Sequence, residues 1–167
     1  MSNILIIGSG ARECIIVKKL LEDSRKINID LNIICLGTTL NPYMKQNTKL
    51  HVVCKLSIQN LEYILNIYNI DFVFIGPENP LELGFSNYLK DKNISCIGPL
   101  KEYAKIETSK IYCREFLKKH KLSQYSPKYY ILNSKNKEII EKKLDLFDKI
   151  IFKNDGLCGG KGVLVQD

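Results

Sequence analysis

Short apolar runs alternate with longer stretches of helical spacing along the first part of the chain. The runs are continuous, which is typical of strands buried on both faces. They are NILII (3–7), LNIICL (31–36), HVVC (51–54), DFVFI (71–75) and ISCIG (94–98). Between them, the stretch from Arg12 to Arg25 and the one after Ser57 carry apolar residues at helical intervals. The alternation predicts an α/β fold with a doubly wound, mainly parallel sheet.

The chain beyond Gly98-Pro99 follows a different pattern. A helical stretch runs to Lys121, and the predicted elements after it are a strand at 127–132, a helix near 135–146 and a strand at 149–153. A glycine-rich loop and the start of another apolar strand close the sequence. We therefore predict one domain over residues 1–98 and the start of a second, incomplete α+β domain over residues 99–167.

Composition and charge narrow the class of protein. Of the residues, 45% are hydrophobic and 26% are charged, as in ordinary globular proteins, and no apolar run is long enough to span a membrane. The net charge of +7 is uneven: 10 Lys/Arg and 9 Asp/Glu up to residue 100 give +1, and 15 and 9 beyond it give +6. Solvated helix faces, a polyphosphate ligand or nucleic acid could each explain this excess. Since aromatic and basic residues do not interleave, we expect no nucleic-acid partner.

The six cysteines argue against both a metal site and disulfides. None of them forms a CxxC pair, and four lie in or beside apolar runs, where cysteine behaves as a small buried hydrophobe. The N-terminus also lacks the basic start and apolar core of a signal peptide. We expect reduced thiols and a cytoplasmic protein.

A glycine turn, GSGARE (8–13), follows the first predicted strand. Glycines there let the backbone approach a phosphate at the N-terminus of the next helix, where free N–H groups and the helix dipole favour an anion. The pattern is not a full dinucleotide-binding motif, because Glu13 replaces its third glycine. A tight turn with no ligand explains the stretch equally well by itself.

A second stretch, GPENPLELG (76–84), follows the fourth predicted strand. Ligands of open α/β sheets bind at the carboxyl ends of the strands. We predict a turn-rich loop that two prolines stiffen and from which Glu78 offers a carboxylate suited to sugar hydroxyls. A rigid turn with an exposed glutamate is the alternative.

The closing loop combines glycines with lysines. Lys153 ends the preceding strand, and Lys161 lies among Gly156, Gly159, Gly160 and Gly162. The Gly-Lys pair is followed by glycine rather than Ser or Thr, so this is not a Walker A motif. Four glycines between two strands predict a mobile flap whose amides can surround polyphosphate; a flexible hairpin is the alternative.

In this order, the stretches resemble the phosphoribosylamine–glycine ligase family (glycinamide ribonucleotide synthetases), ATP-grasp enzymes of purine synthesis. NILIIGSGARE resembles the family's opening strand and turn, and IGPENPLELG resembles its GPExPLxxG loop. The stretch from Cys96 to Leu122 resembles a further family motif around Ser109-Lys110, and KNDGLCGGKGV is similar to KADGLAAGKGV. The resemblance covers the whole chain and implies a pre-ATP-grasp domain followed by part of an ATP-grasp domain.

The resemblance also implies roles for individual residues. It places Gly8, Ser9 and Gly10 near the phosphate of phosphoribosylamine and Glu78 on the ribose, and its motifs add Glu13 and Pro80 to the substrate-binding set. It implies that ATP is bound by Lys110, Lys153, Gly156, Gly159, Gly160, Lys161 and Gly162. The substrates would be phosphoribosylamine, glycine and ATP. No catalytic nucleophile is implied, because ATP activates glycine as an acyl phosphate.

Three departures from the family pattern bear on these roles. Cys14 stands where the family usually has His, and LGTTLNP (36–42) replaces the usual PGNxGT. The chain is also less than half as long as family members, so we expect the Mg²⁺ ligands in a missing C-terminal part and no turnover by this chain alone. A related ATP-grasp carboxylase and a non-catalytic binding remnant are the alternatives.

Overall fold

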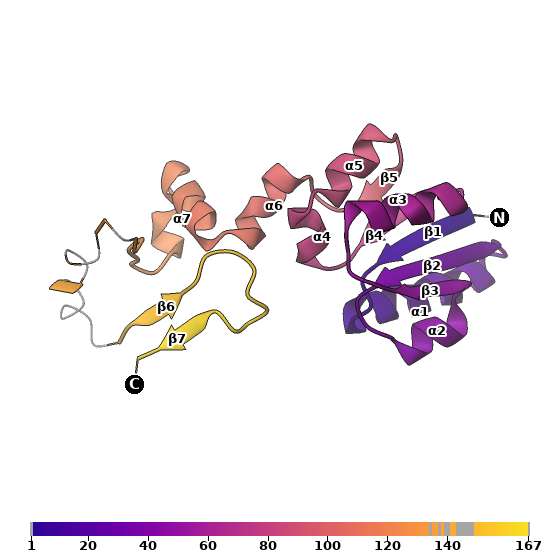
Figure 1. Ribbon diagram of the computed structural model, residues 1–167, viewed down its shortest axis with the longest axis horizontal. Helices are drawn as coiled ribbons and strands as arrows, with labels where there is room; N and C mark the ends of the chain where they lie inside the picture. The colour runs from indigo at the N-terminus through magenta and orange to yellow at the C-terminus, as the bar shows by residue number, and fades with distance from the viewer. Residues whose placement is uncertain (1, 134, 137, 139–140, 143–148, 167) are drawn as a thin grey trace. The chain divides into compact units, whose positions relative to one another are not determined.

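The computed structural model describes residues 2–133, 135–136, 138, 141–142 and 149–166. The chain divides into two compact units, Met1–Ala104 and Lys105–Asp167, and each contains its own sheet (Figure 1). What each unit binds stays a prediction. Within the described residues, no helix is long and apolar enough to cross a membrane.

The first unit is built on a parallel sheet of five strands in the order β3-β2-β1-β4-β5. The strands are β1 (Ser2–Ile7), β2 (Leu31–Gly37), β3 (Leu50–Val53), β4 (Phe72–Ile75) and β5 (Ser95–Ile97). The chain moves outward from β1 to β3 and then crosses to β4 on the other side of β1. The predicted doubly wound parallel sheet is confirmed.

Helices cover both faces of this sheet (Figure 1). They are α1 (Ala11–Lys26), α2 (Pro42–Asn47), α3 (Ile58–Ile67), α4 (Glu78–Glu82) and α5 (Phe85–Asp91). Leu5 and Ile7 pack in the cluster that holds residues of α3 and α5, whereas Ile6 packs in the cluster that holds residues of α1 and α2. Neighbouring residues of a strand face opposite sides of the sheet. Because helices cover both sides, all three side chains are fully buried. This explains why the strands read as continuous apolar runs.

The helix α4 corrects the prediction of a turn-rich loop in GPENPLELG. Pro77 is the N-cap in extended backbone, and the helix begins at Glu78. Pro80 is then its third residue, where a backbone N–H would have no acceptor within the helix, so proline costs no hydrogen bond there. The two prolines therefore permit a short helix instead of preventing one. The helical stretch predicted after Ser57 is confirmed as α3, and the Ser57 hydroxyl caps it by accepting from the N–H of Asn60.

The second unit contains helices and an antiparallel hairpin. Its elements are α7 (Lys110–Lys119), the 3₁₀ turn η1 (Ser123–Tyr125), β6 (Ile151–Lys153) and β7 (Val163–Val165); α6 (Lys101–Thr108) begins in the first unit. The predicted strand at 149–153 is confirmed as β6, which pairs with β7. The predicted strand at 127–132 is wrong: these residues form no regular element. A strand needs a paired neighbour, and no described strand pairs with this segment. The predicted helix near 135–146 lies largely outside the described residues.

All six cysteines are free. Cys35 lies on β2 and is fully buried. Burial raises the pKa of its thiol to about 12, so this cysteine is a neutral core residue. Cys14 packs from α1 against the same apolar cluster.

Candidate functional site

Two of the stretches singled out in the sequence meet at one edge of the first sheet. The glycine turn follows β1 and the Glu78 stretch follows β4, and these strands are neighbours with Ile7 opposite Ile75. The Gly76 N–H donates to the Ile7 carbonyl at 3.0 Å. The direction of the strand order reverses between β1 and β4, and such a switch point is where open α/β sheets bind ligands.

The glycine turn owes its shape to Gly8. Its φ of +115° is unfavourable for a residue with a side chain, and a Cβ there would lie 2.8 Å from Glu13 and from the Pro77 ring. Gly10 has an ordinary φ of −78° and is the N-cap of α1. The first N–H groups of α1 have no acceptor within the helix and are therefore open to an anion.

Glu13 lies inside the protein rather than at its surface. The residue is 3% exposed, and its Oε2 accepts a hydrogen bond from the Gly10 N–H at 2.7 Å. Its Oε1 is buried without a hydrogen-bond partner in the described part of the chain. A Cβ on Gly76 would collide with this carboxylate. Glu13 therefore joins the turn after β1 to the stretch after β4, while its predicted contact with substrate stays a prediction.

An ion pair connects the same two stretches at the surface. The Arg12 guanidinium donates to the Glu78 carboxylate at 3.3 Å, with exposed side-chain fractions of 70% and 42%. Exposed ion pairs contribute only about 0–1 kcal/mol to folding, so the pair does little for stability. It does hold the predicted ribose-binding carboxylate beside a cation. Pro80 is buried in α4 and supports this stretch from within.

The loop after β2 also reaches the glycine turn. The hydroxyls of Ser9 and Thr39 lie 3.0 Å apart, and the Asn41 side chain donates to the Ser9 carbonyl at 3.2 Å. Ser9 is consequently buried. Sequence reasoning missed Arg12, Thr39 and Asn41 as members of this site. The sequence did contain a signal for them, because each follows a predicted parallel strand closely and so lies near its carboxyl end.

The second unit holds the glycine-rich loop between β6 and β7. Gly156, Gly159 and Gly160 have positive φ angles of 79°, 54° and 76°. Gly162 is needed for a different reason, because a Cβ there would lie 2.6 Å from Cys158. The Asn154 N–H donates to the Gly162 carbonyl at 2.8 Å and closes the loop.

The base of this loop is fastened to the start of α7. Lys110 donates to the Gly156 carbonyl at 2.8 Å. The Asp155 carboxylate accepts from the Ser109 hydroxyl at 3.0 Å and from the Ile111 N–H at 3.1 Å. The predicted residues Lys110 and Gly156 are therefore brought together, and Asp155 is a further anchor that sequence reasoning missed.

Lys153 and Lys161 belong to the same hairpin. Both are exposed, Lys153 at the end of β6 and Lys161 at the far end of the loop. Their ammonium groups are accessible to an anionic ligand that lies along the loop. The geometry suits phosphate binding, but their predicted contacts with ATP stay predictions.

Acidification is expected to release the loop from α7. Burial alone would raise the pKa of Asp155, but hydrogen bonds from Ile111 and Ser109 hold it below its ordinary value of 3.8. A carboxyl whose pKa is lower in the folded state stabilises the fold above its unfolded pKa, and this stabilisation is lost as the pH falls through the folded pKa. We expect the amides near Gly156 to be protected from exchange at neutral pH and to lose this protection below about pH 4.

The control for this experiment is Asp155→Asn, which cannot titrate. Its amide protection should be lower than that of the parent chain at neutral pH and should not change further near pH 4. An identical pH profile in the parent and the variant would contradict the anchoring role of Asp155.

Comparison with known proteins identifies the family of the chain. The family model for the phosphoribosylglycinamide synthetase N domain matches residues 2–107. The chain belongs to this family. It is 36% identical to the bifunctional purine biosynthetic protein purD of Dictyostelium discoideum, with 99% of the chain and 20% of that protein covered. It is 32% identical to the phosphoribosylamine–glycine ligase of Pyrococcus furiosus, with 99% of the chain and 36% of that protein covered.

Solved structures agree on the fold. The structure of N5-carboxyaminoimidazole ribonucleotide synthetase from Thermotoga maritima matches with a TM-score of 0.63 at 20% identity, over 99% of this chain and 41% of that one. This likeness shows a shared fold and nothing about substrate. The chain spans about a fifth to about a third of the length of the two curated relatives.

Within this phosphoribosylglycinamide synthetase N domain, the two departures from the family pattern, Cys14 and LGTTLNP (36–42), lie in different places. Cys14 packs against the apolar cluster that holds residues of α1 and α2, so this departure from the expected His lies beside the core. The LGTTLNP stretch instead contributes Thr39 and Asn41, which bond to Ser9. That second departure therefore lies in the candidate site itself.

The residues of the described part do not form a Mg²⁺ site. No group of three or more His, Cys, Asp and Glu side chains among them could hold a metal ion.

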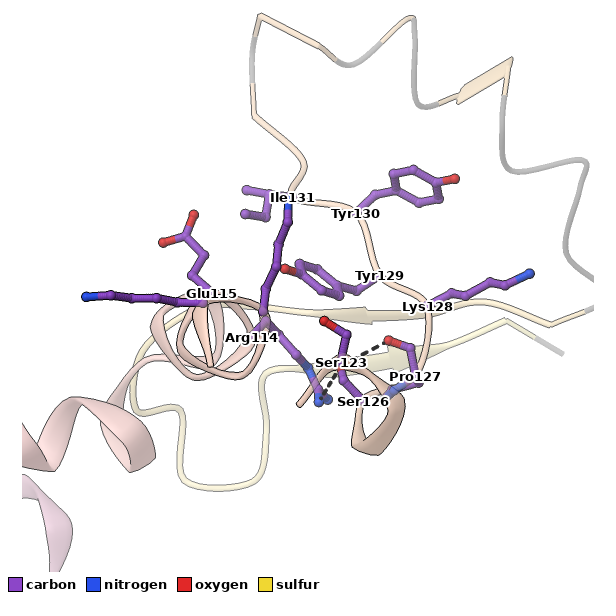
Figure 2. A pocket seen from close by; sticks show the side chains of 11 residues that line it. Arg114, Glu115, Ser123, Ser126, Pro127, Lys128, Tyr129, Tyr130 and Ile131 are labelled. Carbon is purple, nitrogen blue, oxygen red and sulfur yellow. Dashed lines mark hydrogen bonds between the residues drawn. The ribbon is translucent and has the colours of Figure 1, made fainter. Parts of the chain in front are cut away.

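A separate cavity of about 940 Å³ lies in the second unit (Figure 2). Its charged lining residues come from α7 and the segment after η1; they are Arg114, Glu115, Lys118, Lys119 and Lys128. Arg114 donates to the Ser126 hydroxyl at 3.0 Å. The predicted ATP-binding residues lie elsewhere, at the start of α7 and in the β6–β7 hairpin.

Proposed function

We propose that the chain is the N-terminal part of an ATP-dependent ligase that joins glycine to 5-phosphoribosylamine in purine biosynthesis. The names of the curated relatives support this activity. The single observation that carries it is the convergence of the glycine turn and the Glu78 stretch at the switch point of the first sheet. All six cysteines are free, which suits a reducing compartment, and we place the protein in the cytoplasm.

The first unit is proposed to bind phosphoribosylamine. The N–H groups in the first turn of α1 are expected to face the phosphate, since they have no acceptor within the helix. Glu78 accepts hydrogen bonds from the ribose hydroxyls. Glu13 acts behind this surface, because its carboxylate holds Gly10 and the stretch after β4 in place.

The second unit is proposed to bind ATP. Its glycine-rich loop offers backbone N–H groups, and Lys153 and Lys161 offer charge to the triphosphate. Lys110 and Asp155 fix the base of the loop. When ATP is bound it activates the glycine carboxylate for attack by the amine of phosphoribosylamine, so the chain needs only to bind and orient its ligands.

A related ATP-grasp carboxylase is the second candidate, because the fold of N5-carboxyaminoimidazole ribonucleotide synthetase is similar. The two differ in the group that the ribose carries, an amine in one case and an imidazole ring in the other. Tighter binding of an imidazole ribonucleotide than of ribose 5-phosphate by the 167-residue chain would favour the carboxylase.

Ribose 5-phosphate is expected to bind the first unit, and Glu78→Ala is expected to weaken this binding at least about tenfold, because a hydrogen bond to a charged acceptor is worth about 1.5–3 kcal/mol. Titration followed by amide shifts of Gly8 and Gly10 measures both the affinity and the place. Glu82→Ala, at the other end of α4, is the matched control and should bind as the parent chain does. Absence of binding by the parent chain would contradict the proposed function.

A further inference from the structure

The charges around the switch point require a cation if a phosphate is to bind there. Glu13 and Glu78 are both carboxylates, and a phosphate monoester brings roughly 1.5–2 further negative charges at neutral pH. Among the described residues 8–13 and 76–82, which follow β1 and β4, Arg12 carries the one positive side chain. The partial positive charge at the start of α1 helps an anion but does not neutralise two carboxylates.

We propose that Arg12 binds the phosphate of the ligand directly while Glu78 takes the neighbouring sugar hydroxyls. This assignment rests on the proposed function and adds the residue that recognises the phosphorylated end. Arg12 is the second residue of α1, so its side chain starts in the helical turn whose N–H groups are open. A guanidinium and these N–H groups together form a recognition surface for a phosphate.

The hydrogen bonding of Arg12 leaves room for this role. Its guanidinium has five N–H donors in a fixed fork, and in the described part of the chain it makes one hydrogen bond, to Glu78. Its side chain is 70% exposed. Arg12 can therefore keep Glu78 in position and still bind a phosphate through its remaining donors.

A second, independent observation comes from Glu13. Its buried Oε1 has no hydrogen-bond partner among the described residues and lies 4.0 Å from the Arg12 Nε. The guanidinium thus lies between a buried carboxylate and an exposed one. Both attract it toward the switch point, which holds the cation near the ligand instead of leaving it free in solvent. The exposed Arg12–Glu78 pair adds little to the stability of the fold, so we explain it by the position that it gives the guanidinium.

The alternative is that Arg12 only tethers Glu78. Inorganic phosphate separates the two roles, because it needs a cation and has no sugar for Glu78 to bind. If Arg12 binds phosphate, Arg12→Ala weakens inorganic phosphate binding at the start of α1. If Arg12 only tethers Glu78, Arg12→Ala leaves the binding of inorganic phosphate unchanged.

The test is a titration of the 167-residue chain with inorganic phosphate and with ribose 5-phosphate, followed by amide shifts near Gly10. We expect Arg12→Ala to weaken both by about 10- to 100-fold, as the loss of a charged hydrogen-bond pair implies. Arg12→Lys, which keeps the charge but loses the fork, should give an intermediate loss. Arg25→Ala removes the same charge from the other end of α1 and should have no effect.

The outcomes distinguish this inference from the proposed function. If the parent chain and Arg12→Ala bind ribose 5-phosphate with equal affinity, the proposed role of Arg12 is wrong and the proposed function still stands. No binding by the parent chain would contradict both. Circular dichroism and thermal unfolding confirm that each variant is folded, and a folded Arg12→Lys variant tests the role even if Arg12→Ala unfolds.

Discussion

Gly8→Ala is expected to lower the free energy of unfolding of the first unit by about 2–5 kcal/mol, combining backbone strain with overpacking. The φ of +115° at Gly8 is rarely adopted by a residue with a side chain, and the new Cβ would lie 2.8 Å from Glu13 and from the Pro77 ring. The neighbours cannot move aside easily, because Glu13 is buried and Pro77 is rigid. Urea denaturation followed by circular dichroism measures the change.

Gly10→Ala is the matched control for Gly8→Ala. Gly10 has an ordinary φ of −78°, and a Cβ there would meet only the Glu13 Oε2, at 3.0 Å. We expect it to change stability by less than about 1 kcal/mol, the effect of a typical surface substitution or a changed N-cap. Equal losses of stability in the two variants would show that the special conformation of Gly8 is not the cause.

Glu13→Ala is expected to destabilise the first unit by about 2–4 kcal/mol, from a lost hydrogen bond, a lost cap and an emptied space. The substitution leaves the Gly10 N–H without its acceptor and removes the group that fills the space beside Gly8 and Gly76. Thermal unfolding of the 167-residue chain measures this loss.

Glu13→Gln keeps the shape of the side chain and one acceptor oxygen, so we expect its stability to stay within about 1 kcal/mol of the parent. This comparison separates the shape of Glu13 from its charge. A loss as large in Glu13→Gln as in Glu13→Ala would mean that the buried negative charge itself stabilises the fold.

Most of the first unit could be predicted from the sequence, because its signals are local. Leu5, Ile6 and Ile7 are apolar in a row, which is typical of a strand buried on both faces. Ser57 marked the start of a helix by its own side chain. The same kind of reasoning failed at 127–132, where a strand-like run has no partner strand to pair with in the described residues.

The candidate site was predictable only in part. The sequence by itself identified the glycine turn, the Glu78 stretch and the closing loop, since glycines, prolines and their neighbours act within a few residues. It also determined the family, because four such motifs appear in order. It did not show that the Arg12 guanidinium meets Glu78 or that Asn41 supports Ser9.

Only the tertiary structure decided these contacts and the place of Glu13 inside the protein. The order of strands in the sheet puts the ends of β1, β2 and β4 side by side, and no local pattern encodes which strand ends become neighbours. Likewise, Asp155 reads as an ordinary loop residue, and its hydrogen bonds to Ser109 and Ile111 exist because the hairpin loop folds back onto the start of α7. Periodicity and turn chemistry act over a few residues, whereas a site assembled from distant segments depends on how the elements pack.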